Sequence, residues 1–149
     1  MNRSRLLTSS TLLATLLALG ACGMAPTMPM GKTSTTQLSG TSEVPPVMGG
    51  ASGTMLAKLD TQSSVLTWTI TYSGLSGPAT AGHFHGPAIV GQNAGVALPL
   101  TGSLDSPVSG SAKLSAAQLA DVIAGKWYIN LHTATNPGGE IRGQLNLQP

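Results

Sequence analysis

The residues of this chain best suited to chemistry are its three histidines, and two of them form the short pattern His83-Phe84-His85. The surrounding segment is strand-like, and alternate side chains of a strand point to opposite faces of a sheet. Both imidazoles therefore share one face. Phe84 points to the other face and is the better candidate for the core.

The third histidine, His132, ends the segment 127–132. Alternation places the apolar Ile129 and Leu131 on one face of this segment, and groups His132 with Asn130 on the opposite face. All three histidines thus point away from the residues expected in the core. If the two strands are neighbours, the three imidazoles converge.

Three neutral imidazole nitrogens are enough to hold zinc or copper with one coordination position open. The pattern therefore predicts a metal site formed by His83, His85 and His132, with copper favoured over zinc. Metal affinity should fall as the pH drops through about 6.5, where protons compete for the nitrogens. The alternative is that these histidines are ordinary hydrogen-bonding residues of a sheet, because His-x-His is a short pattern.

Polar residues near the histidines could support such a site. Asn130, Glu140 or a backbone carbonyl could accept the second ring N–H of a ligand and orient it. Glu140 and Arg142 share one face of the predicted final strand. They could serve the site, but a solvated cross-strand ion pair is the commoner arrangement and is the one favoured here.

The chain opens with a basic start and an apolar run that ends at its only cysteine. Two arginines precede the segment 6–19, and Leu19-Gly20-Ala21-Cys22 follows. This order is typical of a secretory signal peptide, and the end of the run resembles the lipobox of bacterial lipoproteins. The resemblance implies removal of residues 1–21, lipidation of Cys22, and a domain held at a bacterial cell-envelope membrane, facing the periplasm or the exterior. A short transmembrane helix is the alternative, but the run is shorter than the roughly 20 residues that span a bilayer.

Without residues 1–21 the chain carries five basic and five acidic residues. A neutral domain lacks the cationic face that nucleic-acid binding requires, so we exclude nucleic acid as a partner. A lipidated Cys22 leaves no thiol for a disulfide or a thiolate metal site. The sequence contains no Gly-x-Ser-x-Gly and no paired carboxylates in a catalytic motif, so we expect that the protein is not an enzyme.

The remaining chain predicts a disordered tether over residues 22–36 and one all-β domain over residues 37–149. Strand patterns separated by Gly, Ser and Pro favour an antiparallel β-sandwich or Greek-key barrel. The expected strands are 54–59, 65–72, 81–85, 96–100, 108–114, 127–132 and 140–147. In the clearest of them, alternation places Leu66, Trp68, Ile70 and Tyr72 on the core face. One short helix is expected over 115–124, with Ser115 as its N-cap and Gln118 completing a capping box, and with Leu119, Val122 and Ile123 buried.

Three separated motifs in this order resemble the CHRD domain, which is named for chordin and also occurs in microbial exported proteins. They are Glu43-Val44-Pro45-Pro46, the stretch 79–87 around His83 and His85, and the stretches 127–133 and 136–144 around His132, Glu140 and Arg142. The resemblance covers roughly residues 37–147 and implies a β-sandwich or barrel. The family's recurring histidines correspond to His83, His85 and His132, and its acidic and basic pair to Glu140 and Arg142.

Two functional hypotheses follow. By analogy with chordin, the first is a non-catalytic binding module, anchored by lipid, with a protein or glycan ligand. The second is a copper- or zinc-binding envelope protein that uses the three histidines. Their His-x-His strand resembles the copper-ligand strand of copper-zinc superoxide dismutase, but this chain has too few histidines for a bridged two-metal centre and no second cysteine.

Overall fold

The computed structural model describes residues 31–148. The predicted signal peptide over 1–21, the lipidation site Cys22 and the tether up to residue 30 lie outside the described residues. Within the described part the protein is all-β with one short helix, as the sequence predicts. None of its helices is long and apolar enough to cross a membrane.

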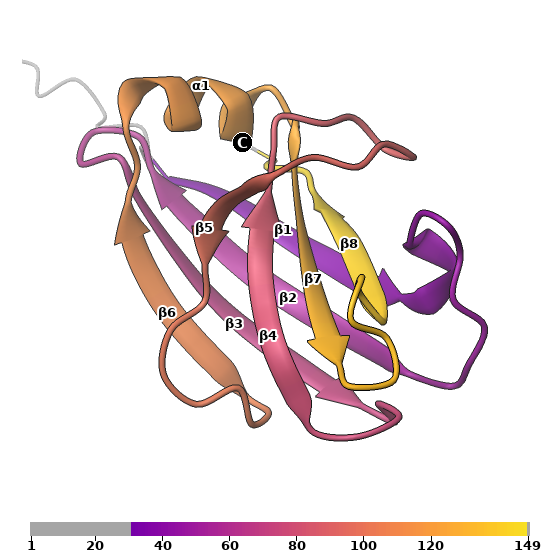
Figure 1. The fold of residues 1–149 in the computed structure, drawn as a ribbon. Coiled ribbons are helices and arrows are strands. Elements are labelled where there is room, and N and C mark those ends of the chain that lie inside the picture. The colour runs from indigo at the N-terminus through magenta and orange to yellow at the C-terminus, as the bar shows by residue number, and fades with distance from the viewer. Residues whose placement is uncertain (1–30, 149) are drawn as a thin grey trace, which may run out of the picture.

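Eight antiparallel strands form one sheet in the order β5-β4-β7-β8-β1-β2-β3-β6. Figure 1 shows that this sheet curls into a half-barrel and that the helix lies across one end. The strands are β1 (Gly31–Ser39), β2 (Ser52–Asp60), β3 (Val65–Ser73), β4 (Ala79–His85), β5 (Val96–Pro99), β6 (Val108–Lys113), β7 (Trp127–Thr133) and β8 (Ile141–Leu145). A 3-10 turn, η1 (Gly40–Ser42), follows β1, and the helix is α1 (Ala116–Ile123).

The core fills the concave side of the curled sheet, where alternate residues of each strand meet. On β3 the predicted inward residues Leu66, Trp68 and Ile70 are buried. Trp68 packs edge-on against Phe84, with 5.1 Å between the ring centroids, so the core assignment of Phe84 is confirmed. Other fully buried side chains of this face are Leu38, Met55, Leu59, Ile129, Leu131, Ile141 and Leu145.

Strand β1 begins at Gly31, so the predicted tether over 22–36 is wrong for its last six residues. Register pairs this strand with β2 from Gly31 opposite Asp60 to Ser39 opposite Ser52. Its inward positions before Leu38 are the hydroxyl residues Ser34 and Thr36. Their hydroxyls bond each other at 3.0 Å, and Thr36 Oγ1 also donates to the carbonyl of Gln144. Alternation carried by hydroxyl groups gives no apolar pattern, and the sequence reading therefore missed this strand.

Helix α1 confirms the predicted capping box. The Ser115 N–H donates to Gln118 Oε1 at 2.9 Å, and the Gln118 N–H donates to Ser115 Oγ at 3.3 Å. Val122 is fully buried, but Ile123 is 48% exposed, so its predicted burial is wrong. The helix has only eight residues and covers the end of the barrel with a narrow stripe, from which Ile123 is rotated by about 100° relative to Val122.

Candidate metal centre

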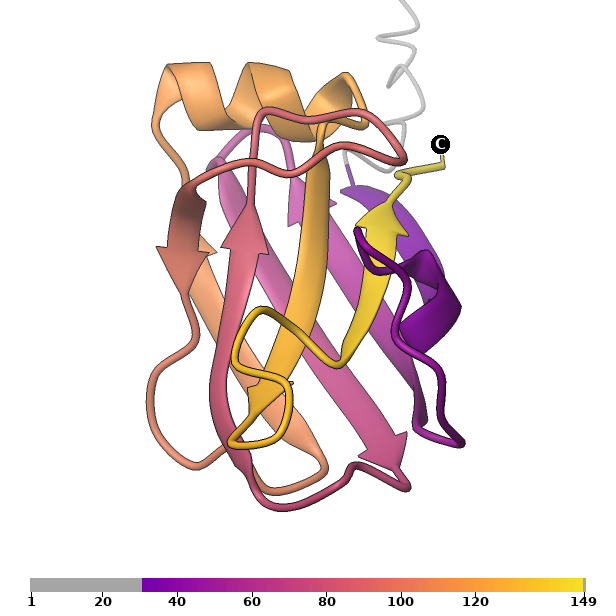
Figure 2. The same ribbon diagram turned by 45° about the vertical axis from the view of Figure 1, so that its right-hand side comes forward.

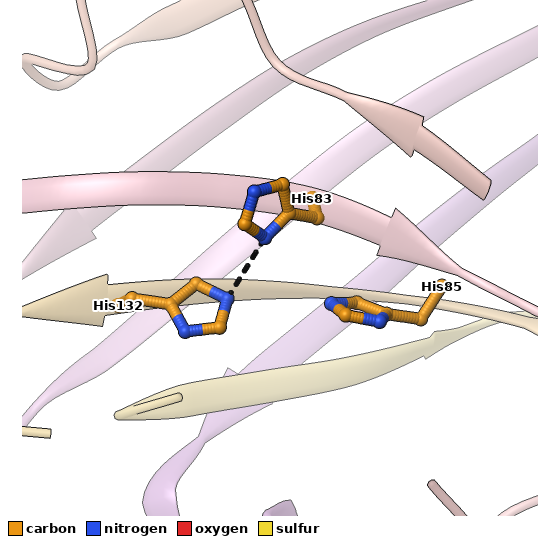
Figure 3. Close-up of side chains that lie close together, drawn as sticks. All are labelled: His83, His85 and His132. Carbon is orange, nitrogen blue, oxygen red and sulfur yellow. Dashed lines mark hydrogen bonds between the residues drawn. The ribbon is translucent and has the colours of Figure 1, made fainter. Parts of the chain in front are cut away.

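The two histidine-bearing strands are neighbours in the sheet, as the metal hypothesis requires. Strands β4 and β7 pair antiparallel, with His83 opposite Asn130, His85 opposite Tyr128 and His132 opposite Ala81. Because the core fills the concave side, the histidines point to the outer face. Figure 3 shows the three imidazoles turned toward one another there, and one ligand nitrogen from each lies within 4.8 Å of the others.

His132 is oriented by a backbone carbonyl. Its Nδ1 lies 2.9 Å from the carbonyl oxygen of Pro137. A carbonyl oxygen only accepts, so Nδ1 carries a proton. Nε2 faces the centre of the cluster and lies 3.0 Å from His83 Nδ1 and 2.9 Å from Asn130 Oδ1. The Asn130 amide oxygen also only accepts, so Nε2 must give up this contact if it is to ligate a metal ion.

His85 follows the same rule from the other side of the cluster. Its Nδ1 lies 2.9 Å from the carbonyl oxygen of Ala94, in the loop 86–95, and therefore donates. The lone pair is left on Nε2, which is buried and has no hydrogen-bond partner in the described part of the chain. A buried acceptor without a partner costs about 1–3 kcal/mol, and a metal ion would supply that partner.

His83 is the member of the cluster that faces solvent. It is half-buried, whereas His85 and His132 are buried. Burial, and then the neighbouring His132 and His85, hold the pKa of His83 below its usual value. The ring is therefore neutral at pH 7, and its exposed side provides a route by which an ion can reach the three nitrogens.

An aromatic and cationic stack supports His85 from behind. The His85 and Tyr128 rings are stacked, with 4.9 Å between centroids and 5° between planes. The Arg142 guanidinium carbon lies 3.9 Å from the centroid of the Tyr128 ring. The Tyr128 hydroxyl accepts from the backbone N–H of Ala94, the residue whose carbonyl holds His85. Stack and loop together restrict His85 to one position.

Arg142 does not form the predicted solvated pair with Glu140. It forms an ion pair with Glu43, with 2.9 Å between Nη2 and Oε2, and donates to Asn93 Oδ1 at 2.6 Å and to the carbonyl of Gln92 at 3.2 Å. Arg142 is 5% exposed and Glu43 is 3% exposed. Burial raises the pKa of Glu43, although Arg142 opposes this shift.

Glu140 is also buried and lies in a separate network. Its Oε1 accepts from the backbone N–H of Ser76, and its Oε2 accepts from the hydroxyls of Ser76 and Thr133. Burial alone would raise its pKa, but the hydrogen bonds from Ser76 and Thr133 together hold it below its usual value. Glu140 and Arg142 do lie on the polar face that the sequence predicts, but loops cover that face. Charges that alternation assigned to solvent are therefore inside the protein.

Gly139 is required where the loop after β7 passes this network. Its φ of +125° is a conformation that other residues rarely adopt, and a β-carbon there would collide with Glu43 Oε1 and lie 2.6 Å from Asn130 Nδ2. Sequence reasoning allowed a backbone carbonyl as the acceptor of a ring N–H but did not identify those of Ala94 and Pro137, and it assigned no role to Glu43 or Tyr128. The only signal for Glu43 was its place in the first of the three motifs.

The sequence model of the CHRD domain matches residues 34–145. The chain belongs to the CHRD family. No curated protein and no solved structure matches the chain. In this CHRD domain the matched range contains every residue of the histidine cluster, its two carbonyl partners, and the stack of Tyr128 and Arg142 with the Glu43 carboxylate. The family resemblance inferred from the three motifs is confirmed.

Proposed function

We propose that this CHRD domain is a non-catalytic binding module that holds one transition-metal ion at His83, His85 and His132. The observation that carries the proposal is that the Nδ1–H groups of His85 and His132 both donate to backbone carbonyls. Ala94 and Pro137 accept from Nδ1 of His85 and His132, so Nε2 is the nitrogen of each ring left to ligate an ion. Nε2 of His85 has no hydrogen-bond partner in the described part of the chain, whereas Nε2 of His132 contacts Asn130 Oδ1. Carbonyl acceptors behind ligating imidazoles are the usual way in which proteins orient a metal ligand.

Copper is the ion that the donor set favours. All three donors are imidazole nitrogens, and nitrogen sites bind copper more tightly than the other available divalent ions. Zinc is the second candidate, because three histidines with an open fourth position also suit zinc. A protein or glycan ligand for the module stays a prediction, since no cluster of described residues points to either class.

We also propose that the domain is displayed at the bacterial cell envelope through a lipid on Cys22. The support is the order Leu19-Gly20-Ala21-Cys22 at the end of the apolar run. Cys22→Ser should leave the fold intact and release the protein from salt-washed membranes, because the lipid supplies the salt-resistant anchoring free energy at about 0.8 kcal/mol per buried methylene. If Cys22→Ser still pellets with membranes after a salt wash, the anchor proposal is wrong.

Calorimetric titration of residues 22–149 with Cu(II) and with Zn(II) tests the metal site. We expect one ion per chain. His85→Ala should weaken binding by more than the roughly 10–100-fold that loss of a supporting residue costs. The control is Thr135→Ala, an exposed position in the loop that contains Pro137, which should bind as the parent does. Equal binding by the parent and His85→Ala, or binding by neither, would remove the site.

A further inference from the structure

The two ends of the half-barrel differ in charge. All four lysines of the sequence, Lys32, Lys58, Lys113 and Lys126, lie at the end where β1 begins. Register shows this: Lys32 and Lys58 lie next to the β2–β3 turn, and Lys113 pairs with Val65 beyond it. We call this the anchor-side end. It comprises the start of β1, the β2–β3 turn, the loop 86–95, α1 and the start of β7. Figure 2 shows α1 and that loop together there.

The lysines of the anchor-side end are free to meet an external partner. Within residues 31–148 the close ion pair joins Glu43 and Arg142, and Lys58 acts on Asp60 only through its charge, without a close contact. Asp60 and Asp121 are the acidic residues of this end, and Asp60 accepts from the N–H groups of Gln62 and Ser63 in its own turn. Four cations against two anions leave this end positive.

The opposite end is acidic. Its acidic residues are Asp105 and the buried Glu140, while Glu43 and Arg142 neutralise each other where Arg142 also bonds the loop 86–95. A domain that is neutral in total is therefore polarised along its strands. Such an arrangement orients a protein at a charged surface without any net attraction far from it.

Exposed aliphatic side chains lie at the same end as the lysines. Ile89 is 57% exposed, Val90 74%, Val96 54% and Ile123 48%. Ile89 and Val90 occupy the turn of the loop 86–95, which the Gln92 N–H closes by donating to the Ile89 carbonyl. A surface that combines lysines with exposed aliphatic side chains is typical of segments that lie in the headgroup region of a bilayer.

We propose that the anchor-side end rests on an anionic lipid bilayer, with its lysines among the headgroups and Ile89, Val90 and Ile123 against the acyl boundary. The positive charge of this end and the short segment between it and Cys22 both favour a bilayer as the partner. Cys22 lies nine residues before Gly31, and nine extended residues reach at most about 30 Å. A lipid on Cys22 would therefore keep this end near the membrane.

This orientation deepens the proposed envelope location and is compatible with the metal site. His83 lies on the outer face of β4 and His132 near the end of β7 that is remote from the lysines, whereas His85 ends β4 beside the loop 86–95 of the anchor-side end. His83 thus stays open to the aqueous side when the anchor-side end is on the bilayer. Neither a metal ion nor a lipid on Cys22 is needed for the contact, so it is tested apart from both proposals.

The test measures binding of residues 22–149 carrying Cys22→Ser to vesicles. All core side chains lie between Leu38 and Leu145, so this chain retains the whole core. We expect binding to phosphatidylcholine vesicles that contain phosphatidylglycerol, little binding to phosphatidylcholine alone, and loss of the electrostatic part at high salt. No binding to the anionic vesicles at low salt would overturn the proposal.

Two matched double variants locate the contact. Lys58→Gln with Lys113→Gln removes two exposed cations and should weaken binding about 25-fold, at about fivefold per lysine. Thr101→Glu with Thr135→Glu makes the same change in net charge at exposed positions of the opposite end, and should weaken binding less than about twofold. Equal losses in the two variants would assign the effect to net charge alone and overturn the proposed surface.

A third variant tests the aliphatic contribution. Ile89→Ser with Val90→Ser should reduce binding to the anionic vesicles at low salt, whereas Met48→Ser, at a still more exposed apolar position of the opposite end, should not. Circular dichroism of each variant checks that it is folded. Reduction by Met48→Ser to the same degree would contradict contact through the loop 86–95.

Discussion

Replacing His85 by phenylalanine should stabilise the metal-free protein or leave it unchanged, while it destroys the metal site. His85 is 9% exposed, and its Nε2 is buried without a partner. In the absence of metal this nitrogen costs about 1–3 kcal/mol of folding free energy. A phenyl ring removes that cost and preserves an aromatic stack on Tyr128.

The opposing term is the hydrogen bond from His85 Nδ1 to the Ala94 carbonyl, which phenylalanine cannot make. A bond of this kind contributes about 1 kcal/mol net. The balance predicts that His85→Phe changes the free energy of unfolding of the metal-free protein by between about 0 and +2 kcal/mol. Core substitutions usually destabilise, so even an unchanged stability is informative.

Urea unfolding in the presence of a chelator measures this difference, with His85→Ala as the matched control. Alanine removes the same nitrogen but also the stack on Tyr128, so we expect it to be less stable than His85→Phe. With copper at about 100 times its dissociation constant, the parent should gain about 2.7 kcal/mol and His85→Phe much less. If metal-free His85→Phe loses more than about 1 kcal/mol of unfolding free energy, the argument that the unpartnered Nε2 destabilises the metal-free protein is refuted.

Three further outcomes are expected. Trp68→Ala should lower the free energy of unfolding by about 3–5 kcal/mol, because Trp68 is buried against Phe84; a loss below about 1 kcal/mol in urea unfolding would contradict the core assignment. The pKa of His83 is lowered in the folded state, so the unfolded chain binds a proton at this residue first. The metal-free protein should therefore lose stability as the pH falls below about 6.5. An unfolding temperature that is constant from pH 7 to 5 would argue against this. Gly139→Ala should destabilise by at least about 1 kcal/mol, through strain at positive φ and collision with Glu43, whereas Gly138→Ala, where nothing lies within 4 Å, should be tolerated; equal stabilities would show that the turn adapts.

Local features of the chain were readable from the sequence because they depend on near neighbours. The burial of Leu66 and Ile70, the shared face of His83 and His85, and the N-cap at Ser115 all follow from backbone periodicity or from contacts within one turn. The three motifs also identified the family correctly. These signals require no knowledge of which strands pair.

Tertiary structure alone decided how the site is assembled. The pairing of β4 with β7 brings His132 beside His83 across 49 positions of sequence, and a strand's own residues do not specify its neighbour. The carbonyls of Ala94 and Pro137 carry no side-chain signal, because every residue has such a group. Glu43 reaches Arg142 across 99 positions and is buried with it, since loops cover a face that alternation left to solvent. Periodicity says which residues share a face, and only packing says what covers that face.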